Sequence, residues 1–160
     1  MNRLLLLACA LLLTACAART PLPDSSPALV APLPLSLQVS NADGQDWLLV
    51  IQAEGSAMRW SLFDPLGVPL ARQSLVDGAW HNDGLLPPNG DARELFAALL
   101  FALTPADELA LSYDQADWQQ QGTDNRQLAP HWRIRYQAPL VIGLDNGKQR
   151  YRVSPLETQP

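Results

Sequence analysis

The stretch AMRWSLFDPLGVPLARQSLV, residues 57–76, decides the fold. It contains two short runs of apolar or alternating residues, Ala57–Phe63 and Val68–Val76, which are typical of strands. Between them, Asp64–Pro65–Leu66–Gly67 has the residues of a type I turn, with aspartate first, proline second and glycine fourth. The stretch therefore predicts a β-hairpin with Leu66 at its tip, and the Leu66 side chain should point outward.

Strands of the same kind precede and follow this hairpin. Leu35–Val39 and Trp47–Ala53 come before it, separated from one another by turn residues, and Trp80 belongs to a further short strand before Gly84. A strand about every ten residues is typical of a β-meander, a sandwich or a barrel.

The C-terminal part repeats the strand pattern. In His131–Ala138, Trp132, Ile134 and Tyr136 share one face, and His131, Arg133 and Arg135 share the other. Further on, Asn146–Gly147 favours a two-residue hairpin loop, because both central residues of a type I′ turn need a positive φ. That loop pairs Ile142 with Tyr151 and Leu140 with Val153 on one face, and Val141 with Arg152 and Gly143 with Arg150 on the other.

Four arginines of this region form a basic stripe if their strands are neighbours: Arg133, Arg135, Arg150 and Arg152. The simpler interpretation is a solvated convex face, and the alternative is a site for lipid phosphate.

A helix is expected between the two groups of strands, over Asp91–Leu103. Asp91 can cap it, and Glu94 can close a capping box three residues later. The helix is apolar on almost every side, so it must be buried on most sides. Thr104 and Pro105 then start a second short helix. The expected fold is mainly β with a helical lid (α+β), a curved antiparallel sheet with helices on its concave face.

The N-terminus has the features of a bacterial lipoprotein signal. Arg3 precedes an apolar run, Leu4–Leu13, which is too short to span a bilayer. Leu13–Thr14–Ala15–Cys16 resembles a lipobox, which implies that residues 1–15 are a signal peptide and that Cys16 is acylated. An ordinary cleaved signal with a chance cysteine is the alternative. No aspartate follows Cys16, which favours the periplasmic face of the outer membrane over inner-membrane retention.

Residues 16–34 are expected to be the lipidated cysteine and a tether, because five prolines fall within positions 21–34. Such a chain favours polyproline II and acts as a semi-rigid spacer, which could hold a domain over residues 35–156 up to roughly 50 Å from the membrane.

The composition narrows the function. The 160 residues carry 11 basic and 16 acidic side chains, a net charge of −5, which argues against nucleic acid as a partner. The sequence has no G-x-S-x-G motif and no H-E-x-x-H motif. It also has no Gly-rich phosphate loop and no zinc-binding cysteine pair. We therefore expect no enzymatic activity, no cofactor and no metal.

Ser61–Leu70 resembles the strand–loop–strand of the LolB family of outer-membrane lipoprotein receptors. The layout that follows, with the Leu95–Leu103 helix, Trp118, Arg126 and the terminal strands, is similar to uncharacterised LolB-like lipoproteins known from aryl-polyene and fatty-acid-like biosynthetic clusters. The resemblance implies an incomplete β-barrel with a hydrophobic cavity for acyl chains, a Pro65–Leu66–Gly67 loop that touches the membrane, and a LolA-like periplasmic carrier as a partner.

The expected cavity is lined by eight large side chains, although the tryptophans among them are equally compatible with an ordinary core. They are Trp47, Trp60, Phe96, Leu99, Leu100, Leu103, Trp118 and Trp132. The sequence thus predicts a lipid-anchored protein that binds a lipid-like molecule, for its reception or placement at the outer membrane. The alternatives are a structural or assembly lipoprotein with a self-filled core and an enzyme acting on an acyl product.

Overall fold

The computed structural model describes residues 19–156. The expected signal peptide and Cys16 lie outside the described residues. The strands are β1 (Leu35–Asn41), β2 (Asp46–Glu54), β3 (Ala57–Phe63), β4 (Pro69–Val76), β5 (Ala79–Asn82), β6 (Trp118–Gln121), β7 (Asn125–Leu128), β8 (Trp132–Ala138), β9 (Val141–Asp145) and β10 (Arg150–Pro155). The helices are α2 (Gly90–Leu103) and α3 (Ala106–Ser112), followed by a 3₁₀ turn, η1 (Gln115–Asp117).

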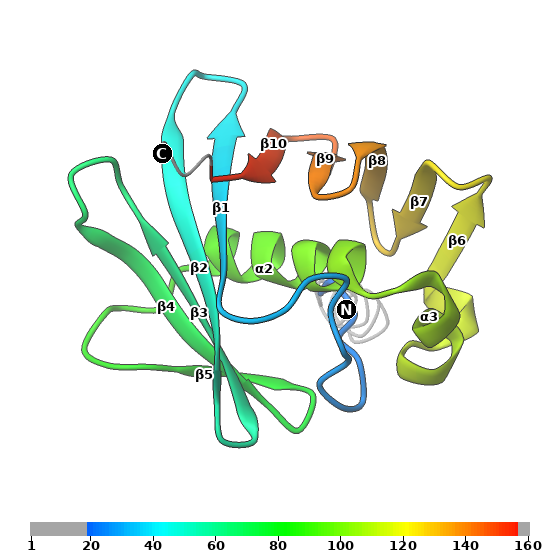
Figure 1. The fold of residues 1–160 in the computed structure, drawn as a ribbon, viewed down its shortest axis with the longest axis horizontal. Helices are drawn as coiled ribbons and strands as arrows, with labels where there is room; N and C mark the ends of the chain where they lie inside the picture. Colours follow the sequence, from blue (N-terminus) through cyan, green and yellow to red (C-terminus); the bar gives the residue numbers. More distant parts are fainter. Residues whose placement is uncertain (1–18, 157–160) are drawn as a thin grey trace, which may run out of the picture.

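All ten strands form one open antiparallel sheet, in the order β5-β4-β3-β2-β1-β10-β9-β8-β7-β6. Two meanders are joined where β1 pairs with β10, for example at Val39 opposite Val153. The chain must therefore pass from one edge strand, β5, to the other, β6, and it does so through α2 and α3. Figure 1 shows α2 inside the curve of the sheet. The expected class, mainly β with helices, is confirmed.

The position of α2 explains its composition. Every side chain from Leu95 to Leu103 is at most 2% exposed. A helix enclosed by a curved sheet needs apolar residues on both sides, so its apolar circumference predicted its burial correctly.

The hairpin between β3 and β4 forms as its turn residues predict. Gly67 N–H donates to the Asp64 carbonyl (3.0 Å), and Asp64 N–H donates to the Val68 carbonyl (3.0 Å). Gly67 has a φ of +81°, as the last residue of a three-residue hairpin loop requires. Leu66 at the tip is 89% exposed.

The expected register of the last hairpin is wrong by two residues. Tyr151 pairs with Leu144 and Val153 with Ile142, so the loop has the four residues 146–149. The Asn146 side chain accepts hydrogen bonds from two backbone N–H groups, those of residues 148 and 149 (2.9 and 2.8 Å), which stabilises the wider loop. A shift by two keeps every side chain on its expected face, so the apolar pattern alone cannot exclude it.

Both helix starts also differ from expectation. Asn89, rather than Asp91, caps α2 by accepting from Ala92 N–H (3.0 Å). The carboxylate of Glu94 binds Thr20 and does not close a capping box. Thr104 donates its hydroxyl to the Leu100 carbonyl (2.7 Å) and so belongs to the end of α2, whereas α3 has no side-chain cap.

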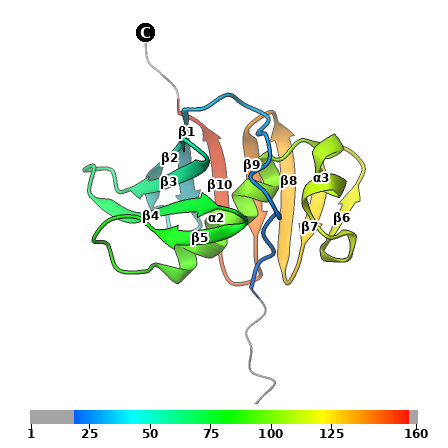
Figure 2. The same cartoon turned by 90° about the horizontal axis from the view of Figure 1, so that it is seen from below.

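Residues 19–34 do not form a free spacer, contrary to the expectation from their prolines. This N-terminal strap (residues 19–34) runs across α2, as the blue chain in Figure 2 shows. Backbone N–H groups of Asp24 and Val30 donate to the carbonyls of Ser112 (3.2 Å) and Leu103 (2.8 Å). The apolar side chains of the strap explain its position, because they cover the side of α2 that the open sheet leaves free; they are Leu22, Leu29, Ala31 and Leu33.

Candidate functional site

Five of the eight side chains expected to line a cavity are packed in the core inside the curved sheet. Trp60, Phe96, Leu99, Leu100 and Leu103 have 0% exposure. A space large enough for water beside a side chain would leave it accessible surface, so no such space adjoins these five. The rings of Trp60 and Phe96 lie 5.5 Å apart, centroid to centroid, and both contact Trp80. The structure therefore differs here from the expected cavity.

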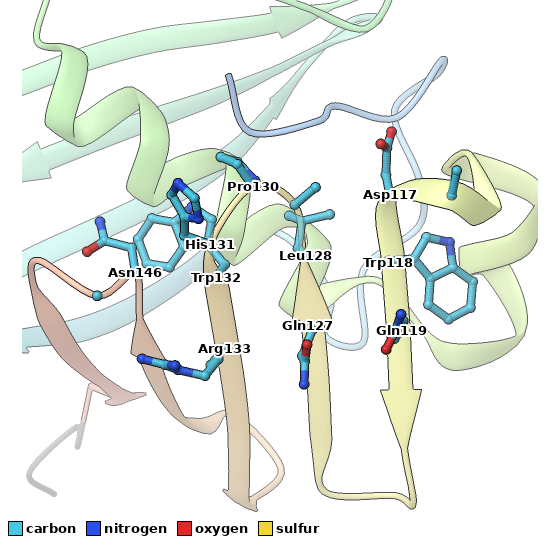
Figure 3. Close-up of a pocket in the computed structure, with 13 residues that line it drawn as sticks. Asp117, Trp118, Gln119, Gln127, Leu128, Pro130, His131, Trp132, Arg133 and Asn146 are labelled. Carbon is cyan, nitrogen blue, oxygen red and sulfur yellow. The ribbon is translucent and has the colours of Figure 1, made fainter. Parts of the chain in front are cut away.

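Two of the remaining three, Trp118 and Trp132, line a surface groove of about 460 Å³ at the ends of β6, β7 and β8. Figure 3 shows His131 and Asn146 beside Trp132 at one end of it and Trp118 at the other. Trp47 is half-buried against Tyr151, with ring centroids 6.3 Å apart, and lines neither this groove nor the pocket described next. Within residues 19–156, no group of three His, Cys, Asp or Glu side chains could hold a metal ion.

A second space, of about 470 Å³, combines apolar walls with a buried charge. It lies between the strap, the C-terminal end of α2 and the β8–β9 hairpin. We name it the Arg126 pocket; it is lined by Val30, Ala102, Thr123, Asp124, Arg126, Tyr136, Gln137, Ala138, Pro139, Leu140 and Ile142. Its volume is in the range typical of small-molecule sites.

Arg126 reaches the inside of the sheet because it alternates with outward-facing residues on β7, where it pairs with Ile134 of β8. The side chain is 8% exposed. Its Nη1 donates to the carbonyls of Thr104 (2.8 Å) and Phe101 (3.4 Å), and the guanidinium carbon lies 5.1 Å from the centroid of the Tyr136 ring. The negative end of the α2 dipole and the ring face therefore offset part of its charge.

The charge of Arg126 is not fully satisfied. No carboxylate of residues 19–156 forms an ion pair with it. Its Nε is buried and has no hydrogen-bond partner in the described part of the chain. A buried ionised group normally has a counter-charge, because removing it from water is costly. This guanidinium can therefore accept an anionic group from outside the chain.

Tyr136 lies beside Arg126 and stays neutral at physiological pH. Its hydroxyl donates to the Ala102 carbonyl (2.8 Å). Burial raises the pKa of Tyr136 to about 12, although the positive charge of Arg126 opposes the rise. The acid that lines the pocket, Asp124, accepts a hydrogen bond from the Thr123 hydroxyl (2.8 Å). The pocket thus offers one buried positive charge among mostly uncharged walls.

Sequence reasoning missed this pocket. The resemblance named Arg126 only as part of a layout, and neither β6 nor β7 was predicted. In β6, WQQQ, three glutamines follow the tryptophan, and in β7, NRQL, Arg126 occupies an inward position where a strand pattern leads one to expect an apolar residue. Neither sequence therefore shows apolar alternation. A lone arginine between two short polar segments carries no distinct signal.

The described part of the chain has no helix with the length and hydropathy of a membrane span. The arrangement can hold an amphiphile, with its apolar part against the pocket walls and an anionic end at Arg126. Comparison of the chain with protein-family models, with curated proteins and with solved structures found no match.

Proposed function

We propose that this protein is a lipoprotein anchored through Cys16 on the periplasmic face of the outer membrane, and that it binds a lipid-like molecule in the Arg126 pocket. The molecule has an apolar chain and an anionic end, such as a carboxylate. The protein receives or places this molecule and does not transform it. The finer fold assignment, a half-barrel of the LolA/LolB type with a periplasmic carrier as partner, belongs to the same proposal.

One observation carries the proposal. Arg126 is a buried guanidinium that lines a partly apolar pocket and forms no ion pair with a carboxylate of residues 19–156. An anionic ligand end supplies the missing charge, and charge-assisted hydrogen bonds of this kind contribute about 1.5–3 kcal/mol each. The proposed ligand position differs from the cavity that the sequence led us to expect.

The filled interior supports a second candidate. Because five expected cavity residues are packed without accessible surface, a structural or assembly lipoprotein that binds no small molecule is also compatible with the fold. The two candidates differ in whether an anionic amphiphile binds.

A fluorescent polyene fatty acid, cis-parinaric acid, tests the proposal. We expect the mature chain with Cys16→Ser, purified without detergent, to bind the acid at least tenfold more tightly than its methyl ester, because the ester lacks the charge. Arg126→Gln should remove this preference and leave the ester affinity unchanged. Arg135→Gln, which removes a charge on the outer face of the sheet, is the matched control and should bind like the parent.

The acid–ester comparison needs no variant at Arg126, so it is decisive even if Arg126→Gln fails to fold. Equal binding of acid and ester, or no binding of either, would overturn the proposal and leave the assembly candidate.

A further inference from the structure

The outer face of β7–β10 is basic in a chain that is acidic overall. Four arginines of β8 and β10 face outward, Arg133, Arg135, Arg150 and Arg152, and Asp145 is the one acidic residue between positions 126 and 156, although the whole chain has a net charge of −5. Outward-facing arginines occur on β8 and β10, because on both strands they alternate with buried apolar residues. These arginines lie on the opposite face of the sheet from the side chain of Arg126.

Two neighbouring rows of residues run across the three strands β8, β9 and β10. In the first row, Arg133, Asp145 and Arg150 are register partners. The Asp145 carboxylate lies 3.5 Å from Arg133 and 3.6 Å from Arg150. The backbone N–H of Gly147 and the two arginines hold the pKa of Asp145 below its usual range. This row therefore binds one anion between two guanidinium groups.

The second row has the same arrangement without the anion. Arg135, Gly143 and Arg152 are register partners on the same three strands. Gly143 takes the place of Asp145 and has no side chain. Within residues 19–156, neither Arg135 nor Arg152 forms an ion pair. The row continues from Arg152 through Ser40 of β1 to Asp46 of β2. The carboxylate of Asp46 accepts a hydrogen bond from the Ser40 hydroxyl.

The surface beside Arg135 is hollowed. Arg135 and Gly143 line a groove of about 440 Å³, together with Gln121 and Asn125, and the groove continues over the first row to Arg133, Asp145 and Arg150. Asn125 is the register partner of Arg135, and Gln121 is the partner of Asn125, so both amides continue the row. The groove thus places uncharged hydrogen-bond donors beside Arg135, whereas Arg152 lies outside its lining.

We propose that Arg135 and Arg152 bind a phosphate group over Gly143, in the position that the Asp145 carboxylate occupies in the neighbouring row. β8 and β10 flank β9 and are therefore about 9.5 Å apart. In the first row, two arginine side chains on these strands both reach one anion across that distance. The planar fork of arginine matches the oxygens of phosphate. The phosphate belongs to a soluble phosphate compound or to a lipid head group, and the chemistry of the site is the same for both.

Gly143 allows a sharp test. A Cβ built on Gly143 would meet only the Arg135 carbonyl oxygen, at 3.8 Å, and its φ lies outside the left-handed region, so other residues fit. Gly143→Asp should place a carboxylate between Arg135 and Arg152 and fill the site from within. Gly143→Ala is its steric control, and Gln119→Asp, on the exposed edge strand β6, adds the same charge elsewhere on the same face.

Two probes distinguish the sources of phosphate. Binding of inorganic phosphate is followed by ³¹P NMR, and binding to phosphatidylcholine vesicles with or without phosphatidylglycerol is followed by sedimentation; both use the mature chain with Cys16→Ser. For at least one probe, we expect Gly143→Asp to weaken binding tenfold or more, and Gly143→Ala and Gln119→Asp to weaken it less than twofold. Inorganic phosphate identifies a soluble compound, and phosphatidylglycerol vesicles alone identify a head group.

Two results would overturn the proposed site. One is the absence of binding of either probe to the parent chain. The other is an equal loss in Gly143→Asp and Gln119→Asp, which would show a diffuse basic surface. The comparison of cis-parinaric acid with its methyl ester tests the Arg126 pocket without any change to this face, so failure of this site and failure of the Arg126 pocket can be told apart.

Discussion

Tyr136 fixes the geometry of the Arg126 pocket from two sides. Its ring lies against the guanidinium of Arg126, and its hydroxyl donates to the Ala102 carbonyl near the end of α2. A half-buried phenol held this way resists deprotonation. The ionisation of Tyr136 therefore reports how dry the pocket is.

We predict that Tyr136→Phe lowers the free energy of unfolding by about 1 kcal/mol at pH 7, because one hydrogen bond is lost while the ring stays. The pKa of Tyr136 is raised to about 12 in the folded protein, so the unfolded chain releases this proton first. The stabilisation is complete below about pH 10 and is lost as pH rises towards 12. Parent stability should therefore fall more steeply over this range than that of the variant.

Urea unfolding at several pH values and the tyrosinate absorbance difference between parent and variant measure both effects. A difference spectrum that titrates near pH 10 would show that water reaches Tyr136.

Among the elements, the β3–β4 hairpin exposes an apolar side chain on a rigid turn. The Asp64 side chain accepts hydrogen bonds from the backbone N–H groups of Leu66 (2.9 Å) and Val68 (2.8 Å), so the loop is held in one conformation. Leu66 contributes nothing to the core at 89% exposure. Its replacement can therefore test a membrane contact without disturbing the fold.

If the proposed function is correct, Leu66→Glu should slow transfer of bound cis-parinaric acid into liposomes while leaving acid binding and the unfolding curve unchanged. Inserting one leucine into a membrane contributes about 1.5–3 kcal/mol, which corresponds to roughly a tenfold to hundredfold effect on membrane association. Leu85→Glu is the matched control, because Leu85 is fully exposed in a different loop. Equal rates for the two variants would assign the β3–β4 hairpin no role in delivery.

The elements also show what the sequence could predict. The β3–β4 turn and α2 were predictable because local chemistry and apolar pattern agree there. The β9–β10 register was not, since a shift by two leaves Ile142 and Val153 on the same face. The Arg126 pocket was missed because Arg126 interrupts the apolar alternation of β7. The packing of the N-terminal strap was missed because a proline-rich composition is the same for a free spacer and for a packed segment.

At the scale of the whole molecule, the N-terminal strap determines how far the domain lies from its proposed anchor. Thr20 is buried, and its hydroxyl accepts a hydrogen bond from Trp132 Nε1 (2.9 Å). Thr20 comes four positions after Cys16, and a fully extended chain of four residues spans at most about 14 Å. An acylated Cys16 would therefore hold the end of the domain near Trp132 close to the membrane, instead of roughly 50 Å away.

The strap leaves the domain beside the β9–β10 loop, as Figure 2 shows. Lys148 in this loop borders the same surface hollow as Thr20 and is the only lysine in the sequence. Gln137 lies at the other end of β8, five residues beyond Trp132 and so about 17 Å along the strand. A label at Lys148 and a label at residue 137 therefore differ in distance from the proposed anchor.

We predict that a donor fluorophore on Lys148 of the lipidated protein in liposomes transfers energy strongly to acceptor-labelled head groups. The same donor on Gln137→Lys, in a Lys148→Arg background, should transfer less, because the docked strap fixes which end of β8 faces the bilayer. Cys16→Ala should abolish transfer at both positions by removing the anchor. Weak and equal transfer from both labels would mean that residues 16–34 act as a free spacer, because a domain on a long tether presents both ends of β8 to the membrane alike.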